Sequence, residues 1–159
     1  MKKILIAIDD SKSAMKAAEY VGQQFAGVAD MQIALVHVLP NLPAIFWDEG
    51  HILSDEEKRD RKKVVDKWLV DRKMRMEPVL RAAMDTLIAQ GIPQAQVRSK
   101  FISDSTDAAE SILEEARDSG CRTIVVGRKG SSGNKHMLLG SIADRIVSRG
   151  SGVAVIIVE

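Results

Sequence analysis

Five short apolar runs alternate with segments of helical periodicity along this chain, and that alternation limits the folds open to it. The runs cover residues 4–8, 33–39, 97–102, 123–126 and 153–158. Apart from the weaker third run, they are continuously apolar, which is typical of strands covered on both faces. Strands separated by helices favour a parallel sheet with right-handed crossovers. We therefore predict an α/β fold: one doubly wound sheet of five parallel strands with helices on both faces, in a single domain over residues 1–159.

Composition limits the partners and the location of the protein. A chain of 159 residues with a net charge of +1 gives no reason to expect nucleic acid or an acidic membrane surface as a partner. No apolar run approaches the roughly 20 residues that a membrane span needs, and the N-terminus lacks a signal-peptide pattern. Cys121 is the only cysteine, so no intrachain disulfide can form. We expect a cytoplasmic protein.

Residues that favour helix starts precede the helical segments. Ser11 or Ser13 can cap the first helix, and Ser105 or Thr106 can cap the helix after the third apolar run. Ser141 can cap the last helix.

Residues 41–76 form the irregular part of the chain. They predict a loop that contains Phe46 and Trp47, followed by a helix of mixed charge that starts near Ser54. Pro78 is expected to break or restart this helix, because proline lacks the N–H donor and clashes one turn back. We interpret the segment as a loop plus charged-helix insertion with a solvated face. A partner-binding arm is the alternative interpretation.

A glycine-rich loop joins the fourth apolar run to the last helix. It reads Gly-Arg-Lys-Gly at 127–130 and, nine residues later, Gly-Ser at 140–141. Glycines let the backbone approach an anion, and the start of a helix favours negative charge. Arg128 and Lys129 add positive charge there. The spacing fits neither the Walker phosphate loop nor the dinucleotide fingerprint, and a plain surface loop can have the same composition.

Asp9 ends the first apolar run, where open α/β sheets place their ligands. Its carboxylate can bind a ribose or help to hold a metal, or it can serve as a helix cap or turn residue. In the expected sheet the first and fourth strands are neighbours, so Asp9 and Gly127 end side by side. This convergence predicts a nucleotide site.

The remaining reactive side chains predict no catalyst. His37 lies within an apolar run and is interpreted as a core histidine bonded to a backbone group, and His136 as an exposed loop residue. No histidine, cysteine and carboxylate cluster has metal-ligand spacing, so we expect no metal site built from protein side chains alone. No general base is placed to act on bound phosphates, and we predict no catalytic residue.

Four segments together resemble the universal stress protein family. Residues 3–11 resemble its first strand and acidic end, and residues 35–38 its second strand. Glycines and serine in 124–141 resemble its nucleotide signature, and residues 155–158 its last strand. The resemblance implies the strand order 3-2-1-4-5 and ATP in a cleft at the ends of the first and fourth strands, with Mg²⁺ or Mn²⁺ held through the phosphates.

The resemblance also implies which residues contact the nucleotide. Adenosine would lie against Ala7, Ile8, Asp9 and Val38, and the ribose against Val126 and Gly127. The phosphates would lie against the remaining residues, which are Lys129, Gly130, Gly140, Ser141, Ile142 and Ala143. The chain departs from the family at Lys129, where a histidine is common, and at 103–106, where Gly-x-Pro is usual. Family members commonly dimerise through the last strand, which implies a homodimer through residues 153–158.

Our leading hypothesis is an ATP-binding protein that acts as a nucleotide-dependent stress-response switch, with slow or no hydrolysis. The alternative is an interaction module without a physiological nucleotide, whose charged segment 54–76 binds an unidentified protein partner. Adenylate transfer is disfavoured, because the chain lacks the Ser-Gly-Gly and His-x-Gly-His motifs of enzymes that carry it out.

Overall fold

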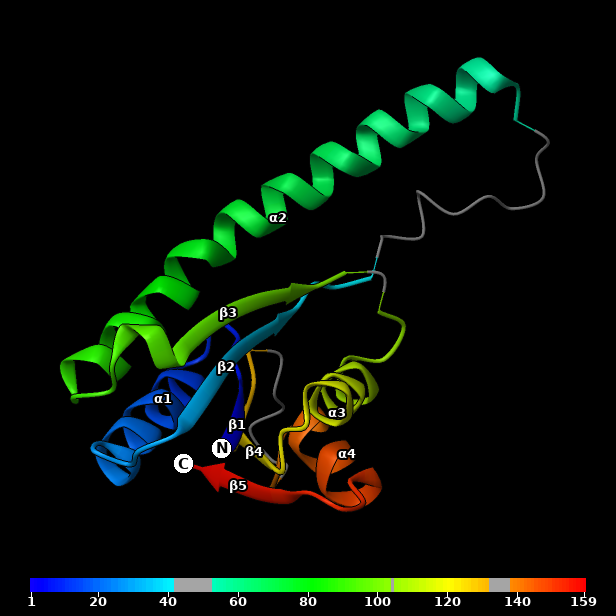
Figure 1. Cartoon of the computed structure of the whole chain (residues 1–159). Helices are drawn as coiled ribbons and strands as arrows, with labels where there is room; N and C mark the ends of the chain where they lie inside the picture. Colours follow the sequence, from blue (N-terminus) through cyan, green and yellow to red (C-terminus); the bar gives the residue numbers. More distant parts are fainter. Residues whose placement is uncertain (42–52, 104, 132–137) are drawn as a thin grey trace.

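The computed structural model describes residues 1–41, 53–103, 105–131 and 138–159, and its centre is a parallel β-sheet (Figure 1). The strands are β1 (Lys2–Ala7), β2 (Met31–Val38), β3 (Val97–Ile102), β4 (Thr123–Gly127) and β5 (Ala154–Val158). All neighbouring strands pair in parallel, in the order β3-β2-β1-β4-β5. The predicted α/β class and strand order are confirmed.

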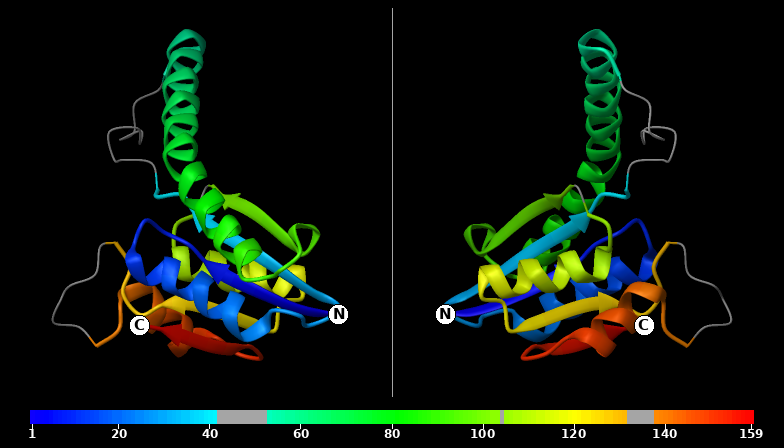
Figure 2. Two further views of the ribbon diagram at one scale, coloured as in Figure 1. Left: turned by 90° about the vertical axis from the view of Figure 1, so that its left-hand side faces the viewer. Right: turned by 90° about the vertical axis from the view of Figure 1, so that its right-hand side faces the viewer.

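Helices cover both faces of the sheet (Figure 2). They are α1 (Lys12–Phe25), α2 (Asp55–Ala89), α3 (Ala108–Ser119) and α4 (Ser141–Arg149), with a short 3-10 turn, η2 (Gln94–Gln96), before β3. Helices α1 and α2 pack on one face, and α3 and α4 pack on the other.

The core consists of two apolar layers separated by the sheet. Ile6 and Leu35 face α1 and α2, whereas Leu5 and Ile124 face α3 and α4. Successive strand residues point to opposite faces, so a strand buried on both sides must be apolar at nearly every position. This geometry explains the continuous apolar runs of the sequence.

Two of the predicted caps illustrate how local chemistry starts a helix. Ser11 caps α1, because its hydroxyl accepts a hydrogen bond from the N–H of Ala14 at 3.2 Å. The prediction of Ser105 or Thr106 as the cap of α3 is wrong, and Asp107 occupies that position. The Ser105 hydroxyl is buried and accepts a hydrogen bond from the Ser111 hydroxyl, and the carboxylate of Asp107 accepts from the N–H groups of Ala109 and Glu110 at the helix start instead.

Pro78 lies inside α2, which continues through it for 35 residues. The prediction that Pro78 breaks the helix is therefore wrong. Pro78 and Met74, whose carbonyl loses its usual donor, both lie on the exposed side of the helix, where water can bind that carbonyl. The N-terminal part of α2 extends beyond the sheet (Figures 1 and 2).

Some predictions fall on parts of the chain that the structure does not describe. The loop with Phe46 and Trp47 and the exposed position of His136 lie outside the described residues. Within the described ranges, no helix combines the length and the apolar content that a bilayer crossing needs.

Candidate functional site

A cavity of about 560 Å³ opens at the carboxyl ends of β1, β2 and β4. Every residue predicted to contact a nucleotide lines this cavity except Gly140, which lies beside it at the start of α4. The lining members of that set are Ala7, Ile8, Asp9, Val38, Val126, Gly127, Lys129, Gly130, Ser141, Ile142 and Ala143. The fold therefore gathers residues from three strand ends and one helix start around a single space.

Asp9 lies where β1 meets the glycine-rich loop. Ile6 is opposite Val125 in the β1–β4 pairing, so Asp9 emerges beside the end of β4. One carboxylate oxygen of Asp9 accepts a hydrogen bond from the N–H of Ser11 at 2.9 Å, and the other accepts from the N–H of Ser131 at 3.0 Å. Asp9 thus forms a turn and anchors the loop, and its carboxylate oxygens keep lone pairs that can accept from a ribose hydroxyl.

Two glycines are required because other atoms approach them closely. A Cβ atom at Gly130 would lie 2.9 Å from a carboxylate oxygen of Asp9, and one at Gly127 would lie 2.6 Å from the carbonyl carbon of Ser13. Gly127 therefore lets α1 pack against the end of β4, and Gly130 lets the loop reach Asp9.

Arg128 holds the ends of the loop together. Its backbone N–H donates to the carbonyl of Val158 at 2.6 Å, and its carbonyl accepts from the N–H of Gly140 at 2.8 Å. Its guanidinium donates to the carbonyl of Leu138 at 2.8 Å and forms an ion pair with Glu159. Arg128 is thus engaged outside the cavity, and Lys129 is the cation of this pair that lines it.

The start of α4 forms one wall of the cavity. Gly140 is the N-cap and provides no capping side chain, so the prediction that Ser141 caps the helix is wrong by one position. Within the described residues, no capping side chain accepts a hydrogen bond from the first-turn N–H groups of Ser141, Ile142 and Ala143. All three residues line the cavity. Uncapped N–H groups and the positive end of the helix dipole stabilise a bound anion there.

His37 connects the ends of β1 and β2. Its Nδ1 lies 2.7 Å from the carbonyl oxygen of Ile8, so Nδ1 carries the proton and donates. The predicted bond to a backbone group is confirmed. The ring also meets Phe101 edge-on, with 6.1 Å between ring centroids, and it lines the cavity.

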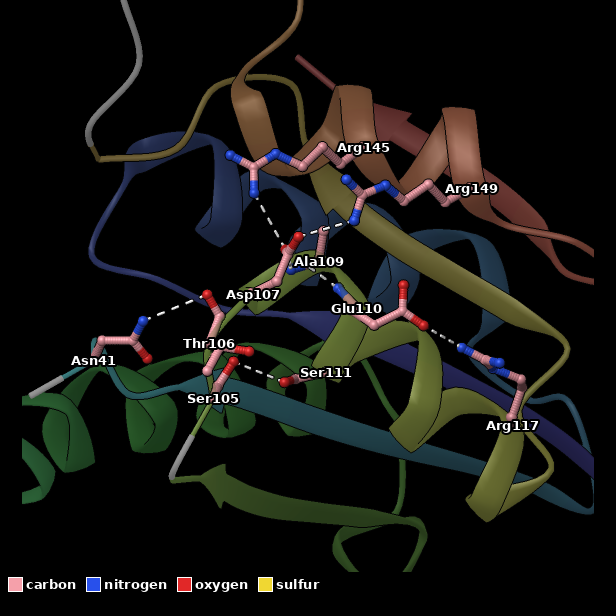
Figure 3. Close-up of polar contacts among 10 residues, drawn as sticks. All are labelled: Asn41, Ser105, Thr106, Asp107, Ala109, Glu110, Ser111, Arg117, Arg145 and Arg149. Atoms are coloured by element: carbon pink, nitrogen blue, oxygen red, sulfur yellow. Dashed lines mark hydrogen bonds and ion pairs between the residues drawn. The ribbon is translucent and has the colours of Figure 1, made fainter.

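Asp107 ties α3 to α4 beside the cavity (Figure 3). Arg145 and Arg149 of α4 donate to its two carboxylate oxygens at 3.2 Å and 2.9 Å. Partial desolvation raises the pKa of Asp107, but the N–H groups of Glu110 and Ala109, together with the two guanidinium groups, lower that pKa below its usual value. The ionised carboxylate therefore fixes α3 against the helix whose start faces the cavity.

The loop before α3 closes another side of the cavity. Ser105 and Thr106 line the cavity, and the amide of Asn41 donates to the carbonyl of Thr106 at 3.4 Å (Figure 3). This loop lacks the Gly-x-Pro motif that is usual in the family. Hydrogen bonds from Asn41 to Thr106 and from Ser111 to Ser105 hold it instead.

Sequence reasoning missed the contribution of α2. Arg72, Arg75, Met76 and Val79 line the cavity from this helix. A helical signal existed, because the buried stripe at Leu80, Ala83 and Leu87 extends back at intervals of three and four through Met76 to Arg72. The expected break at Pro78 interrupted that stripe in the prediction.

Candidate metal ligands are dispersed in the described part of the chain. Nowhere in residues 1–41, 53–103, 105–131 and 138–159 do three histidine, cysteine, aspartate or glutamate side chains cluster in a way that could hold a metal ion.

Comparison with known proteins agrees with this architecture. The model of the universal stress protein family matches residues 1–158, and the chain belongs to this family. Universal stress protein YxiE of Bacillus subtilis (strain 168) is 30% identical over 152 residues, covering 91% of this chain and 90% of that protein.

Solved structures share the fold at lower sequence identity. The structure of hypothetical protein MJ0577 is 21% identical with a TM-score of 0.74, and the match covers 99% of this chain and 94% of that chain. A universal stress protein crystallised in complex with cAMP is 19% identical with a TM-score of 0.64, over 99% of this chain and 96% of that chain. At these sequence identities, the likeness shows that the chain shares the fold of these structures.

Proposed function

We propose that this protein binds an adenine nucleotide, ATP in particular, in the cavity and acts as a nucleotide-dependent switch in a stress response. One observation carries the proposal: the uncapped start of α4, the glycine-rich loop and Asp9 meet around one cavity of about 560 Å³. A family member of the same fold has been solved with cAMP, which supports an adenine nucleotide as the ligand.

We expect the parts of ATP to lie in the cavity in a definite order. Phosphates would accept hydrogen bonds from the N–H groups of Ser141 and Ile142, with Lys129 adding charge. The ribose would lie near Asp9 and the base near Val38. Mg²⁺ or Mn²⁺ would be held through the phosphate oxygens and would neutralise part of their charge.

The arrangement favours binding over hydrolysis. Asp9 and Asp10 are the carboxylates among the described lining residues, and Asp9 already accepts from two backbone N–H groups. Bound phosphates would be positioned, but none of the described residues that line the cavity is placed to activate water. Hydrolysis should therefore be slow or absent, as a radiolabelled ATP assay can measure.

Calorimetric titration of the nucleotide-stripped protein with ATP, with and without Mg²⁺, tests the proposal. We expect micromolar affinity. Ser141→Glu should weaken binding by about tenfold or more through repulsion of the phosphates, which corresponds to roughly 1.4 kcal/mol. The same change favours the helix itself, because an acidic residue in the first turn complements the dipole.

Ser151→Glu is the matched control, because Ser151 is exposed and does not line the cavity. It should leave the ATP affinity unchanged. Equal affinity of wild-type protein and the Ser141→Glu variant would contradict the phosphate position.

A second candidate function is the interaction module, favoured by the exposed surface of α2. Val64, Val70 and Met74 are exposed on this helix. Such a module would bind a protein partner through this surface without a nucleotide. Absence of co-purified or titratable adenine nucleotide, together with partner capture that depends on Val70 and Met74, would favour it.

The free edge of β5 supports a homodimer as part of the proposal. β5 is an edge strand, and Ile157 is 37% exposed there. An exposed apolar edge can pair with a second copy across a two-fold axis. Sedimentation should give a dimer mass that Ile157→Lys reduces to a monomer, and a monomeric wild-type protein at micromolar concentration would contradict the dimer.

A further inference from the structure

Two arginines of α2 line the cavity on the side away from the glycine-rich loop. Arg72 and Arg75 project from a helix that packs along β2 and β3, whereas the loop follows β4 (Figure 1). β1 separates β2 from β4, and neighbouring strands lie roughly 4.8 Å apart, so the ends of β2 and β4 are on the order of 10 Å apart. A nucleotide with its phosphates at the loop therefore places its base toward α2.

Neither arginine forms an ion pair within the described ranges. The pairs of α2 in those ranges are Lys58–Asp55 and Lys63–Asp60, nearer its start. Arg72 instead lies over the ring of Trp68, with its guanidinium carbon 5.2 Å from the ring centroid. The charge of Arg72 is thus oriented by an aromatic ring rather than neutralised.

The contact with Trp68 places the Arg72 guanidinium over the indole ring. Trp68 and Arg72 are four positions apart on one helix, so the two side chains are neighbours. A guanidinium is planar and stacks on aromatic rings with either face. When one face is covered by an indole, the other remains available to a second planar ring.

We infer that Arg72 is a specificity-determining residue of the cavity, which stacks on the nucleobase while Trp68 supports it from behind. Arg75 contributes positive charge at the same wall. This inference rests on the proposed nucleotide binding and adds the wall that recognises the base. It also gives part of the charged insertion a role in ligand binding.

The test compares two ligands, ATP and inorganic tripolyphosphate, which shares the phosphate chain and lacks the base. Arg72→Ala should weaken ATP binding by about 5- to 30-fold, in line with guanidinium–aromatic contacts, and leave tripolyphosphate binding unchanged. Arg72→Lys should behave like Arg72→Ala, because lysine keeps the charge and loses the planar group. Lys73→Ala is the matched control, since it removes the same charge one position away on an exposed site that does not line the cavity.

Several outcomes would overturn the inference. Equal weakening for both ligands would assign Arg72 to the phosphates, and full rescue by lysine would reduce its role to charge. An effect of Lys73→Ala as large as that of Arg72→Ala would indicate long-range attraction only. If wild-type protein binds ATP and the Arg72 variants bind it equally well, the inference fails alone. If wild-type protein binds no nucleotide, the proposed function fails with it.

Tryptophan fluorescence provides an independent readout. The chain has two tryptophans, so Trp47→Phe leaves Trp68 as the only one. ATP should change the emission of Trp68 in this variant, tripolyphosphate should not, and adding Arg72→Ala should abolish the ATP response. An unchanged emission at saturating ATP would contradict the stacked arrangement.

Discussion

The two ends of α2 are parts of one helix, yet different interactions hold them. Toward its C-terminus the helix buries Leu80, Ala83 and Leu87 against α1 and the sheet. In residues 55–76 no residue is buried. That part relies on the capping box of Ser54 and Glu57 and on ion pairs between neighbouring turns.

The comparison teaches that continuity of a helix does not mean uniform stability. Exposed pairs within a helix contribute about 0.2–0.5 kcal/mol each, whereas full burial of a leucine contributes about 1.5–3 kcal/mol. Residues 55–76 should therefore open locally at a lower free energy than the packed end. Arg72 lies in this less stable part, so the α2 wall of the cavity is complete only while residues 55–76 remain helical.

Truncating a buried side chain of α2 should have the largest effect. Leu87 is fully buried, and Leu87→Ala should lower the free energy of unfolding by about 2–5 kcal/mol because it leaves a cavity. Val70 is 53% exposed, and Val70→Ala should change the free energy of unfolding by less than about 0.5 kcal/mol. Denaturant unfolding of both variants measures the contrast, and similar losses would show that residues 55–76 are packed in solution.

Replacing Pro78 tests how the two ends are joined. Pro78→Ala restores an N–H donor for the carbonyl of Met74 and should stabilise the helix locally by up to about 3 kcal/mol. Amide hydrogen exchange should slow in residues 55–76. Glu77→Ala is the control, because it changes the adjacent exposed residue without altering backbone hydrogen bonding. Unchanged exchange in the Pro78 variant would mean that the proline causes no strain.

Asp107 offers a cap on a packed helix for comparison with Ser54. Asp107→Ala should lower the free energy of global unfolding by about 0.5–2 kcal/mol, because the N–H groups of Ala109 and Glu110 lose their acceptor. Asp107→Asn should lose less, since asparagine also caps and only the ion pairs to α4 are weakened. Thermal unfolding measures both variants.

The pH dependence of this loss follows from the lowered pKa of Asp107. A carboxyl whose pKa is lower in the folded state stabilises the protein above its unfolded pKa of about 3.9, and that stabilisation is lost as the pH falls through the folded pKa. The difference between wild-type protein and Asp107→Asn should thus be full at neutral pH and shrink below about pH 4. A constant difference down to pH 2 would contradict the ionised pair.

Ser54→Ala should have the smallest effect on global stability. It removes the cap of a helix end whose residues 54–60 are all exposed, so fraying should increase in the first turns, with a local cost of about 1 kcal/mol. The pKa of Glu57, which the backbone N–H and the hydroxyl of Ser54 lower, should rise only part of the way toward its usual value, because the backbone N–H remains in the variant. NMR titration of Glu57 measures this change, and a matching drop in global stability would show that the whole helix unfolds as one unit.

Local patterns predicted those elements whose chemistry is complete within a short stretch. The strands β1, β2 and β4 were predictable because burial on both faces demands continuous apolar residues. Ser11 was predictable as a cap because the hydroxyl and its N–H donor are three residues apart. Asp107 was not, because the buried contact that occupies Ser105 depends on packing.

The candidate site divides in the same way. The sequence by itself determined the glycine-rich loop and its meeting with Asp9, since adjacent parallel strands bring their carboxyl ends together. Only the tertiary structure decided that Arg128 turns outward and that α2 passes Pro78 to bring Arg72 to the cavity. The path of α2 depends on Leu80 and Leu87 packing against α1 and the sheet, and this packing between distant segments carries the helix through Pro78, where the local pattern predicts a break.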